Sequence, residues 1–345
     1  MTTDTVALVE SPAQLLHLLE WAHVEQAAER TVAVVLAPVE ETSLAQLRQM
    51  AVYADEENMA VEWHYPRASA AARLRTLQQV SRRVAKARRL VIGDPFSGMI
   101  QALLLGANPH EAVVVDDGTA TLEFAAQLSS GEPLRRWDAP PSVLEVARAP
   151  LARQARKFFA SERVRLFTVM PVAGMPPSKV RDHTYNWTRR RFGPPRVVPG
   201  VDVVGSSLAE SGVVDTAAYL DSIAKLAARC GGQGRYFAHR KEAAEKLAQI
   251  ATTGLQVVRP EVPLEIELSR GSVAAKLASF PSSVGYTLPL VLAGVATTIE
   301  LQPVPVGMLT SRVGPAAKRF LERIGADMRD ASMVAAPLAG VSSLG

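Results

Sequence analysis

The chain has 345 residues, 48% of them hydrophobic and 21% charged, which excludes a disordered or fibrous protein and indicates a folded one. This length exceeds the size at which a single core usually keeps growing, so two domains are expected. A net charge of +4 favours anionic ligands or a membrane surface. Nucleic acid is a weaker alternative, because the arginines alternate with acids and no aromatic-rich binding module is recognisable.

The chain carries one cysteine, Cys230, which cannot form an internal disulfide and is typical of a reducing compartment. The opening MTTDTVALVESPAQ contains an acid and only a short apolar run, unlike a signal peptide. The apolar run 288–295 is too short to span a bilayer. We therefore predict a cytoplasmic protein.

Strand and helix patterns alternate through the first half of the chain. Ser11 is the expected cap of the first helix and Pro12 its first residue. The apolar runs predict strands at 5–10, 31–37, 61–65, 90–93 and 111–115, and the intervening patterns predict helices at 12–29, 43–58, 69–88 and 96–105. This alternation is typical of a parallel α/β sheet.

The pattern weakens between 131 and 200, where prolines are crowded, and there we expect connections and lids. Alternation then resumes, with strands expected at 201–204, 234–237, 255–258, 276–279 and 297–301, and helices at 216–229, 240–252 and 283–292. The sequence therefore predicts an α/β fold of two Rossmann-like domains facing a cleft: 1–195 with the acceptor and the catalytic base, and 200–333 with the donor. We also expect a helix near 315–323 that returns to the first domain, and a flexible tail at 334–345.

Two carboxylates, Asp116 and Asp117, end the buried strand in VVVDDGTATL and precede Gly118. A strand that is apolar on both faces is expected in the middle of a parallel sheet, where its carboxyl end faces the ligand site. One interpretation is structural: one carboxylate caps the turn at Gly118, and the other is solvated. The other is a general base, whose pKa the neighbouring carboxylate raises by repulsion.

Three strand-to-helix turns in the second half carry side chains suited to an anion. They contain Gly205 and Ser206 in GSSLAESG, His239 and Arg240 in YFAHRKE, and Ser282 and Ser283 in SFPSSVGYTL. Hydroxyls, imidazole and helix N-terminal amides can all bind phosphate. The plainer interpretation of each is a helix cap. Neither GxGxxG after the first strand nor GxxxxGK[ST] occurs, which argues against dinucleotide oxidoreductases and P-loop enzymes.

These segments, in this order, resemble the bacterial sialyltransferases of GT-B fold, which include the lipooligosaccharide sialyltransferases and, more distantly, the capsular polysialyltransferases. Asp116-Asp117-Gly118 matches the family's acidic-acidic-Gly motif, His239-Arg240 matches its His-Pro motif in part, and Ser282-Ser283 matches its Ser-Ser/Thr motif. VESPAQLL, IGDPFSG and VGSSLAESGVV look like its strand-turn segments, so the resemblance spans most of the chain. Arg240 departs from the motif proline.

The resemblance implies transfer of sialic acid or a related acidic sugar from a CMP-sugar to a glycan, by inverting displacement. Asp116 would be the base, oriented by Asp117, and His239 would stabilise the CMP phosphate. Ser282, Ser283 and Arg240 would bind that phosphate, Glu265 would hold the ribose, and Gly118, Gly205 and Ser206 would line the substrates. Glu267 competes with Glu265, and an exposed strand glutamate is the plain interpretation of both.

No cofactor and no metal are expected, because a CMP donor has one phosphate, served here by histidine and serine. The near alternative is a transferase for CMP-Kdo or a UDP-sugar, and the alternative of another class is a catalytically silent nucleotide- or glycan-binding protein. The expected partners are the nucleotide sugar and a glycan or glycolipid acceptor. Two basic runs, ARQARKFF and TRRRF, occur together with the aromatic residues Phe158, Phe159, Trp187 and Phe192. One interpretation is solvated surface charge. The alternative is peripheral contact of the protein with the inner face of an anionic membrane.

The other histidines are His17, His23, His64, His110 and His183. They show no spacing typical of metal ligands, so we expect them to be structural or exposed.

Overall fold

The computed structural model describes residues 3–131, 134–136, 143–231 and 234–311, with scattered positions between 313 and 326. The chain divides into two compact units. The first comprises 1–196, 260–272 and 290–293, and the second comprises 197–259, 273–289 and 294–345. Each unit contains its own sheet, which confirms the predicted α/β class with two Rossmann-like domains.

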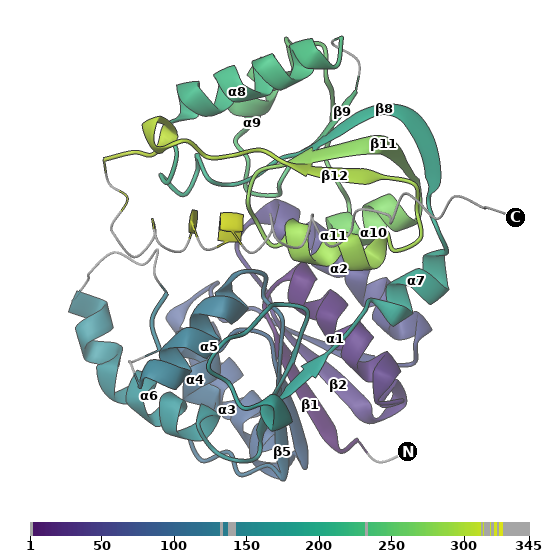
Figure 1. Ribbon diagram of the computed structural model, residues 1–345. Coiled ribbons are helices and arrows are strands. Elements are labelled where there is room, and N and C mark those ends of the chain that lie inside the picture. Colours follow the sequence, from purple (N-terminus) through teal and green to yellow (C-terminus); the bar gives the residue numbers. More distant parts are fainter. Residues whose placement is uncertain are drawn as a thin grey trace, which may run out of the picture. The chain divides into compact units, whose positions relative to one another are not determined.

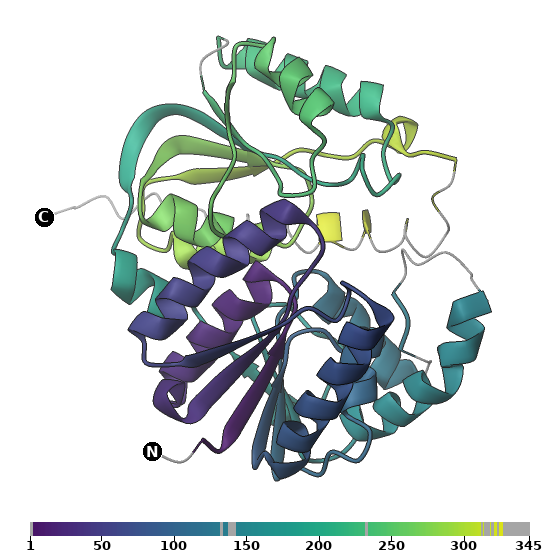
Figure 2. The same ribbon diagram turned by 180° about the vertical axis from the view of Figure 1, so that it is seen from behind.

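The first unit is built on a seven-stranded parallel sheet in the order β3-β2-β1-β4-β5-β6-β7. Helices lie on both sides of it, as the opposite views in Figures 1 and 2 show. Its strands are β1 (Thr5–Val9), β2 (Thr31–Leu36), β3 (Ala60–His64), β4 (Arg89–Ile92), β5 (Glu111–Val115), β6 (Val164–Thr168) and β7 (Val180–Asp182). Its helices are α1 (Pro12–Val24), α2 (Glu41–Glu56), α3 (Ala70–Lys86), α4 (Gly98–Leu103), α5 (Ala120–Ser130), α6 (Val143–Phe159) and α7 (Asn186–Phe192).

The central strands are apolar because helices cover both of their faces. Every residue of β1 and β2 is buried, and alternate residues of β1, β4 and β5 join one hydrophobic cluster. The helix starts follow the expected capping chemistry: the Ser11 side chain accepts the backbone N–H of Gln14, with Pro12 as the first helical residue. The predicted cap of α1 is therefore confirmed.

The second unit contains a five-stranded sheet in the order β10-β9-β8-β11-β12. Its strands are β8 (Arg196–Val204), β9 (Arg235–Phe237), β10 (Gln256–Val258), β11 (Ser272–Ser279) and β12 (Thr298–Leu301), and its helices are α8 (Thr216–Arg229), α9 (Ala244–Ala251) and most of α11 (Val284–Val291). The described residues also include three short 3-10 turns: Ala28–Arg30, Pro177–Lys179 and Val306–Met308.

The main differences from the sequence prediction lie in the proline-rich stretch and in two further helices. The proline-rich stretch forms α6, β6, β7 and α7, and α6 continues through Pro150. Helix α5 follows the DDG turn, and α10 (Leu264–Ser269) packs against α7 within the first unit. Most of the helix expected near 315–323, and all of the tail at 334–345, lie outside the described residues.

Candidate functional site

The chain order reverses between β1 and β4 in the first sheet, because β2 and β3 extend it on one side and β5 to β7 on the other. In parallel α/β sheets ligands bind outside the carboxyl ends of the strands at such a reversal. Glu10 directly follows β1, and Asp94 follows β4 after one glycine. The sequence thus places two acids at the position where this fold binds ligands.

Glu10 is held in a largely buried position with one ion-pair partner. Its Oε1 lies 2.9 Å from an Nη of Arg67, its backbone N–H donates to Gln14 Oε1 at 2.7 Å, and its side chain is 9% exposed. Burial raises the pKa of Glu10 to about 7; the charge of Asp94 adds to this increase, and Arg67 and Ser97 oppose it. Near neutral pH this carboxyl group therefore exchanges protons, as a general acid or base must.

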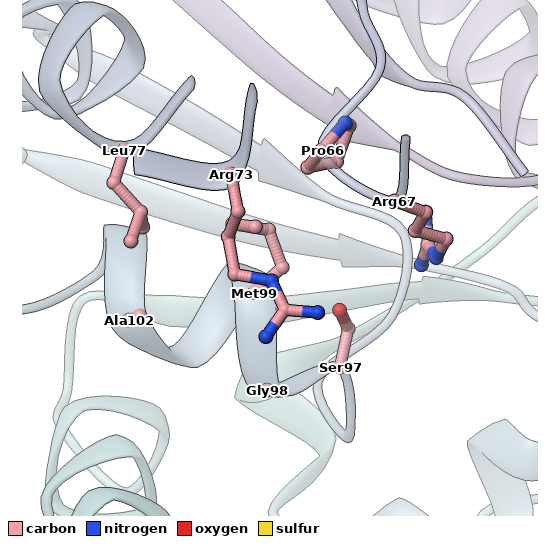
Figure 3. A pocket seen from close by; sticks show the side chains of 8 residues that line it. All are labelled: Pro66, Arg67, Arg73, Leu77, Ser97, Gly98, Met99 and Ala102. Carbon is pink, nitrogen blue, oxygen red and sulfur yellow. The ribbon is translucent and has the colours of Figure 1, made fainter. Parts of the chain in front are cut away.

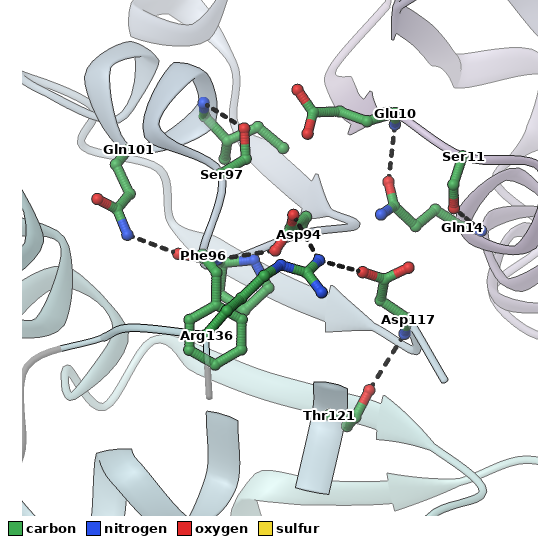
Figure 4. Close-up of polar contacts among 12 residues, drawn as sticks. Glu10, Ser11, Gln14, Asp94, Phe96, Ser97, Gln101, Asp117, Thr121 and Arg136 are labelled. Carbon is green, nitrogen blue, oxygen red and sulfur yellow. Dashed lines mark hydrogen bonds and ion pairs between the residues drawn. The ribbon is translucent and has the colours of Figure 1, made fainter. Parts of the chain in front are cut away.

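Asp94 and Asp117 share one arginine (Figure 4). Arg136 Nη2 lies 2.9 Å from Asp94 Oδ2 and 3.0 Å from Asp117 Oδ2. Burial raises the pKa of Asp94; the nearby Asp117 charge acts in the same direction, and Arg136 against it. The backbone N–H groups of Phe96 and Asp117 bond to Asp94 Oδ1 and Thr121 Oγ1, which fixes both turns.

A pocket of about 380 Å³ is lined by residues that follow β3, by residues of α3 and α4, and by Ser97 at the start of α4 (Figure 3). Arg67 and Ser97 belong both to its wall and to the surroundings of Glu10. Arg73, in the first turn of α3, reaches toward Ser97, so the pocket has two guanidinium groups at its polar side. The lining is completed by Pro66, Leu77, Gly98, Met99 and Ala102. The volume is at the lower end of the range of small-molecule sites.

Asp116, the predicted base, is completely buried. It accepts the Thr168 hydroxyl at 2.5 Å and the Val169 N–H at 2.8 Å, and it lies 3.6 Å from His183 Nε2. Burial alone would raise the pKa of Asp116, but hydrogen bonding with His183 and Thr168 and the charges of the two nearby histidines outweigh it. The expectation of a raised pKa at Asp116 was therefore wrong, because donors surround this carboxylate.

Asp117 and Gly118 lie in the turn between β5 and α5. The Asp117 carboxylate points toward Arg136 (Figure 4), so the adjacent acids face different surroundings. Gly118 has φ +61°, in the left-handed region that favours glycine, and its carbonyl accepts the Thr121 N–H at the start of α5. Their roles in substrate binding stay predictions.

In the second sheet the chain order reverses between β8 and β11, and Gly205 and Ser206 follow β8. A Cβ at Gly205 would lie 2.2 Å from Glu242 Oε2 and 2.8 Å from the Tyr236 hydroxyl, so only glycine fits there. The Ser206 hydroxyl is buried and has no hydrogen-bond partner among the described residues. The role of Ser206 in ligand binding stays a prediction.

His239 follows β9, and Glu242 holds its backbone in place. Its backbone N–H donates to Glu242 Oε2 at 2.6 Å, and its Nδ1 accepts the Lys241 N–H at 3.2 Å. Glu242 is itself buried between the Tyr236 hydroxyl at 2.7 Å and Lys246 Nζ at 2.7 Å. Burial raises the pKa of Glu242, against the opposing charge of Lys246.

Of the remaining predicted residues, all but Arg240 lie at helix starts. Ser282 and Ser283 precede α11, and their carbonyls accept N–H groups of its first turn. Arg240 is partly exposed in the turn after His239. Glu265 lies in the first turn of helix α10, not in a strand, and the structure groups this helix with the first unit, apart from His239 and the serines.

Sequence analysis missed the acids Glu10 and Asp94 and their arginines Arg67 and Arg136. The signal for both acids was the one used for Asp116: a carboxylate at the carboxyl end of an apolar strand. The arginines could not be found in this way, because Arg136 lies 42 residues from Asp94 in the chain and Arg67 lies 57 residues from Glu10.

The basic–aromatic runs do not offer all their aromatic rings to a membrane. Phe159 is buried against Phe124, and Trp187 is buried with its indole N–H donating to Glu57 at 2.9 Å. The part of the membrane interpretation that uses these two rings was wrong, because they complete the core of the first unit. Among the described residues no helix combines the length and apolar character needed to cross a bilayer.

No family model matches the chain, and no curated protein matches it. Several solved structures are similar to it over most of its length. One is a Listeria monocytogenes protein provisionally assigned as a UDP-N-acetylglucosamine 2-epimerase, with a TM-score of 0.49 and 11% identity over 96% of this chain and 88% of that one. Another is HepE of Anabaena in complex with UDP and glucose, with a TM-score of 0.48 and 11% identity over 95% and 90%.

The E. coli heptosyltransferase WaaC with ADP-2-deoxy-2-fluoro heptose gives a TM-score of 0.40 and 13% identity, over 92% of this chain and 99% of that one. Similarity at this level does not transfer an activity to this chain. None of these three structures is named a sialyltransferase, and the resemblance to that family stays a prediction.

Proposed function

We propose that the protein is a glycosyltransferase that uses a nucleotide sugar, with the acceptor held in the first unit and the nucleotide in the second. The observation that carries the proposal is Glu10, a carboxyl group with a pKa of about 7, at the strand reversal beside a pocket. Glycosyl transfer to a hydroxyl needs a base that is partly deprotonated near neutral pH. Glu10 meets this requirement better than Asp116, whose oxygens are occupied by donors.

The proposed reaction is a single inverting displacement. Glu10 takes the proton of the acceptor hydroxyl while the hydroxyl oxygen forms a bond to the anomeric carbon. The bond between that carbon and the donor phosphate oxygen breaks, and the nucleotide leaves with the electron pair. His239, Ser282 and Ser283 are proposed to stabilise the charge that develops on the leaving phosphate, with Arg240 beside them.

Asp94, Asp117 and Arg136 support this role of Glu10. The buried charge of Asp94 helps to keep the pKa of Glu10 high, and Arg136 limits the negative charge of the cluster. Arg67 holds the Glu10 carboxylate and also donates to the carbonyls of Leu36 and Ala37 at 3.0 and 3.1 Å, which fixes its position. In this proposal Asp116 holds the loop that carries Asp117 in place and does not contact the substrate.

The finer proposal is a CMP-sugar donor carrying sialic acid or a related acidic sugar. It is supported by the motif matches at His239 and Ser282-Ser283 and by the orphaned Ser206 hydroxyl in the same unit. We propose that the donor phosphate needs no divalent metal ion, since imidazole and hydroxyl groups are present to stabilise a single phosphate. A CMP-Kdo or UDP-sugar donor would use the same acceptor-activating residues.

Calorimetry with CMP, UMP, UDP and GDP, each in EDTA, tests the donor class. We expect CMP to bind most tightly and His239→Ala to weaken that binding. Tighter binding of UDP would mean that the donor is a UDP-sugar and not a CMP-sugar. The assignment of Glu10 as the base would not change. Absence of binding by all four nucleotides would contradict the proposed function.

A further inference from the structure

Three metal-ligating side chains converge in the interior of the first unit. His17 comes from α1, Asp116 follows β5, and His183 follows β7. One ligand atom from each lies within 4.8 Å of the other two. The three residues are 3%, 0% and 4% exposed, so this cluster lies in the interior of the first unit.

The spacing of the facing atoms is that of ligands around one ion. His17 Nδ1 lies 3.2 Å from His183 Nε2, and His183 Nε2 lies 3.6 Å from Asp116 Oδ2. Two nitrogen ligands at about 2.0–2.1 Å from a tetrahedral metal ion are about 3.3–3.4 Å apart. The two observed separations bracket this value.

The outer contacts orient these ligands as in metal sites. The Asp116 carboxylate accepts two hydrogen bonds, from Thr168 and Val169, and the His183 ring stacks on Phe167 at 4.5 Å with an interplanar angle of 4°. His17 Nε2 faces the Tyr185 hydroxyl at 3.5 Å. In metal sites hydrogen bonds orient the ligating carboxylates and imidazoles, as those to Asp116 and His17 would here, whereas the His183 ring is held by stacking on Phe167.

Hydrogen bonding alone satisfies the cluster poorly. A single proton between His17 Nδ1 and His183 Nε2 joins the two rings, and the buried His183 Nδ1 has no partner among the described residues whether or not an ion is bound at Nε2. Asp116 is then a fully buried carboxylate 3.6 Å from its nearest imidazole nitrogen. A cation at the convergence point would compensate this charge and use both imidazole lone pairs.

We propose that His17, Asp116 and His183 bind a divalent transition metal ion, of which Zn²⁺ is the best match to two imidazoles and a carboxylate. The ion is structural. It joins α1, the turn after β5 and the segment after β7, and the two histidines lie 166 residues apart in the chain. It is distinct from any metal at the donor phosphate and does not depend on the proposed transferase activity.

The site is buried, so the ion must enter during folding, and the test therefore includes refolding. The full chain is purified through a tag without histidines, and its metal content is measured by plasma mass spectrometry. We expect about one equivalent of metal per chain, as for a structural ion bound during folding. After unfolding in chelator, refolding with Zn²⁺ should give a higher Tm than refolding without it, and refolding with Co²⁺ should give visible d–d absorption.

His17→Gln and His183→Gln should each lose most of the bound metal, whereas the exposed His110→Gln should keep it. If either ligand variant does not fold, the wild-type metal content and the Co²⁺ spectrum decide. A wild-type protein that contains less than about a tenth of an equivalent, with neither a Zn²⁺ effect on Tm nor Co²⁺ absorption, would overturn the proposal. Full metal content in both ligand variants would overturn it as well.

Discussion

Glu10 Oε1 lies 2.9 Å from an Nη of Arg67, so the acid that follows β1 is held by a cation that follows β3. Arg67 also donates to two carbonyls at the end of β2, which ties the ends of three neighbouring strands together. Arg67 also lines the pocket, and the charge of Asp94 contributes to the raised pKa of Glu10. This arrangement gives the carboxylate a fixed orientation while burial keeps its pKa high.

The raised pKa of Glu10 predicts a stability that depends on pH. A carboxyl group whose pKa rises from 4.5 to about 7 on folding favours the folded state below pH 4.5, and this contribution is lost as the pH rises through 7. The full contribution is on the order of 3 kcal/mol. Urea unfolding between pH 4.5 and 8 should show the decline, and Glu10→Gln should remove most of it. An unchanged pH dependence in Glu10→Gln would show that other groups cause it. Glu41→Gln, at an exposed position, is the matched control.

Asp116→Asn should act on stability more than on chemistry. The amide keeps the size of the side chain but replaces one acceptor oxygen with a donor, which would face the Val169 N–H or the Thr168 hydroxyl. A loss of about 2–4 kcal/mol is expected when a buried carboxylate that accepts two hydrogen bonds is disrupted. Thermal unfolding and the turnover of the folded fraction should be measured together. Wild-type stability with turnover reduced by a hundredfold or more would restore Asp116 as the base.

Arg73→Gln should weaken binding of an acceptor that carries an anionic group. The Arg73 guanidinium points into the pocket, and its removal should raise the acceptor KM by about tenfold with little change in kcat, as expected for a lost ground-state contact. The nearby exposed Arg75→Gln, on the same helix but outside the pocket lining, should change neither constant. Equal effects of the two substitutions would mean that only the general charge of α3 matters.

His239→Ala should impair both turnover and nucleotide binding, because the imidazole is proposed to contact the phosphate in the ground state and in the transition state. Calorimetry with CMP and initial-rate measurements at saturating donor separate the two effects. Glu242 bonds to the backbone of His239 and is not proposed to contact the nucleotide. Glu242→Gln should therefore mainly lower stability, since it disturbs contacts with Tyr236 and Lys246. Wild-type CMP binding in His239→Ala would remove this residue from the donor site.

Local patterns predicted most of the regular structure. The fully buried strands β1 and β2 and the Ser11 cap follow from short-range chemistry, and their boundaries agree with the sequence to within a few residues. Helix α6 was not predicted because Pro150 usually ends a helix, yet here it lies inside one. Helix α10 was not predicted because a short helix of six residues leaves little periodic signal.

The candidate site was only partly predictable. The principle that ligands bind at the carboxyl ends of parallel strands pointed to Asp116 and Asp117, and it applies equally to Glu10, which was counted as the last strand residue. The difference between these acids depends on their neighbours. Thr168 and His183 surround Asp116, whereas Glu10 borders a pocket, and such tertiary contacts leave no periodic trace in the sequence.

The pH dependence of kcat/KM for sugar transfer, compared between the wild-type protein and Glu10→Gln, tests the central claim most directly. Once the donor nucleotide is known, the wild-type rate should rise with pH through an apparent pKa near 7, as Glu10 loses its proton. Glu10→Gln should reduce turnover by about 10²- to 10⁴-fold, abolish this limb of the profile and leave nucleotide binding unchanged. A Glu10→Gln protein that transfers sugar at the wild-type rate, with the same pH profile, would contradict the account.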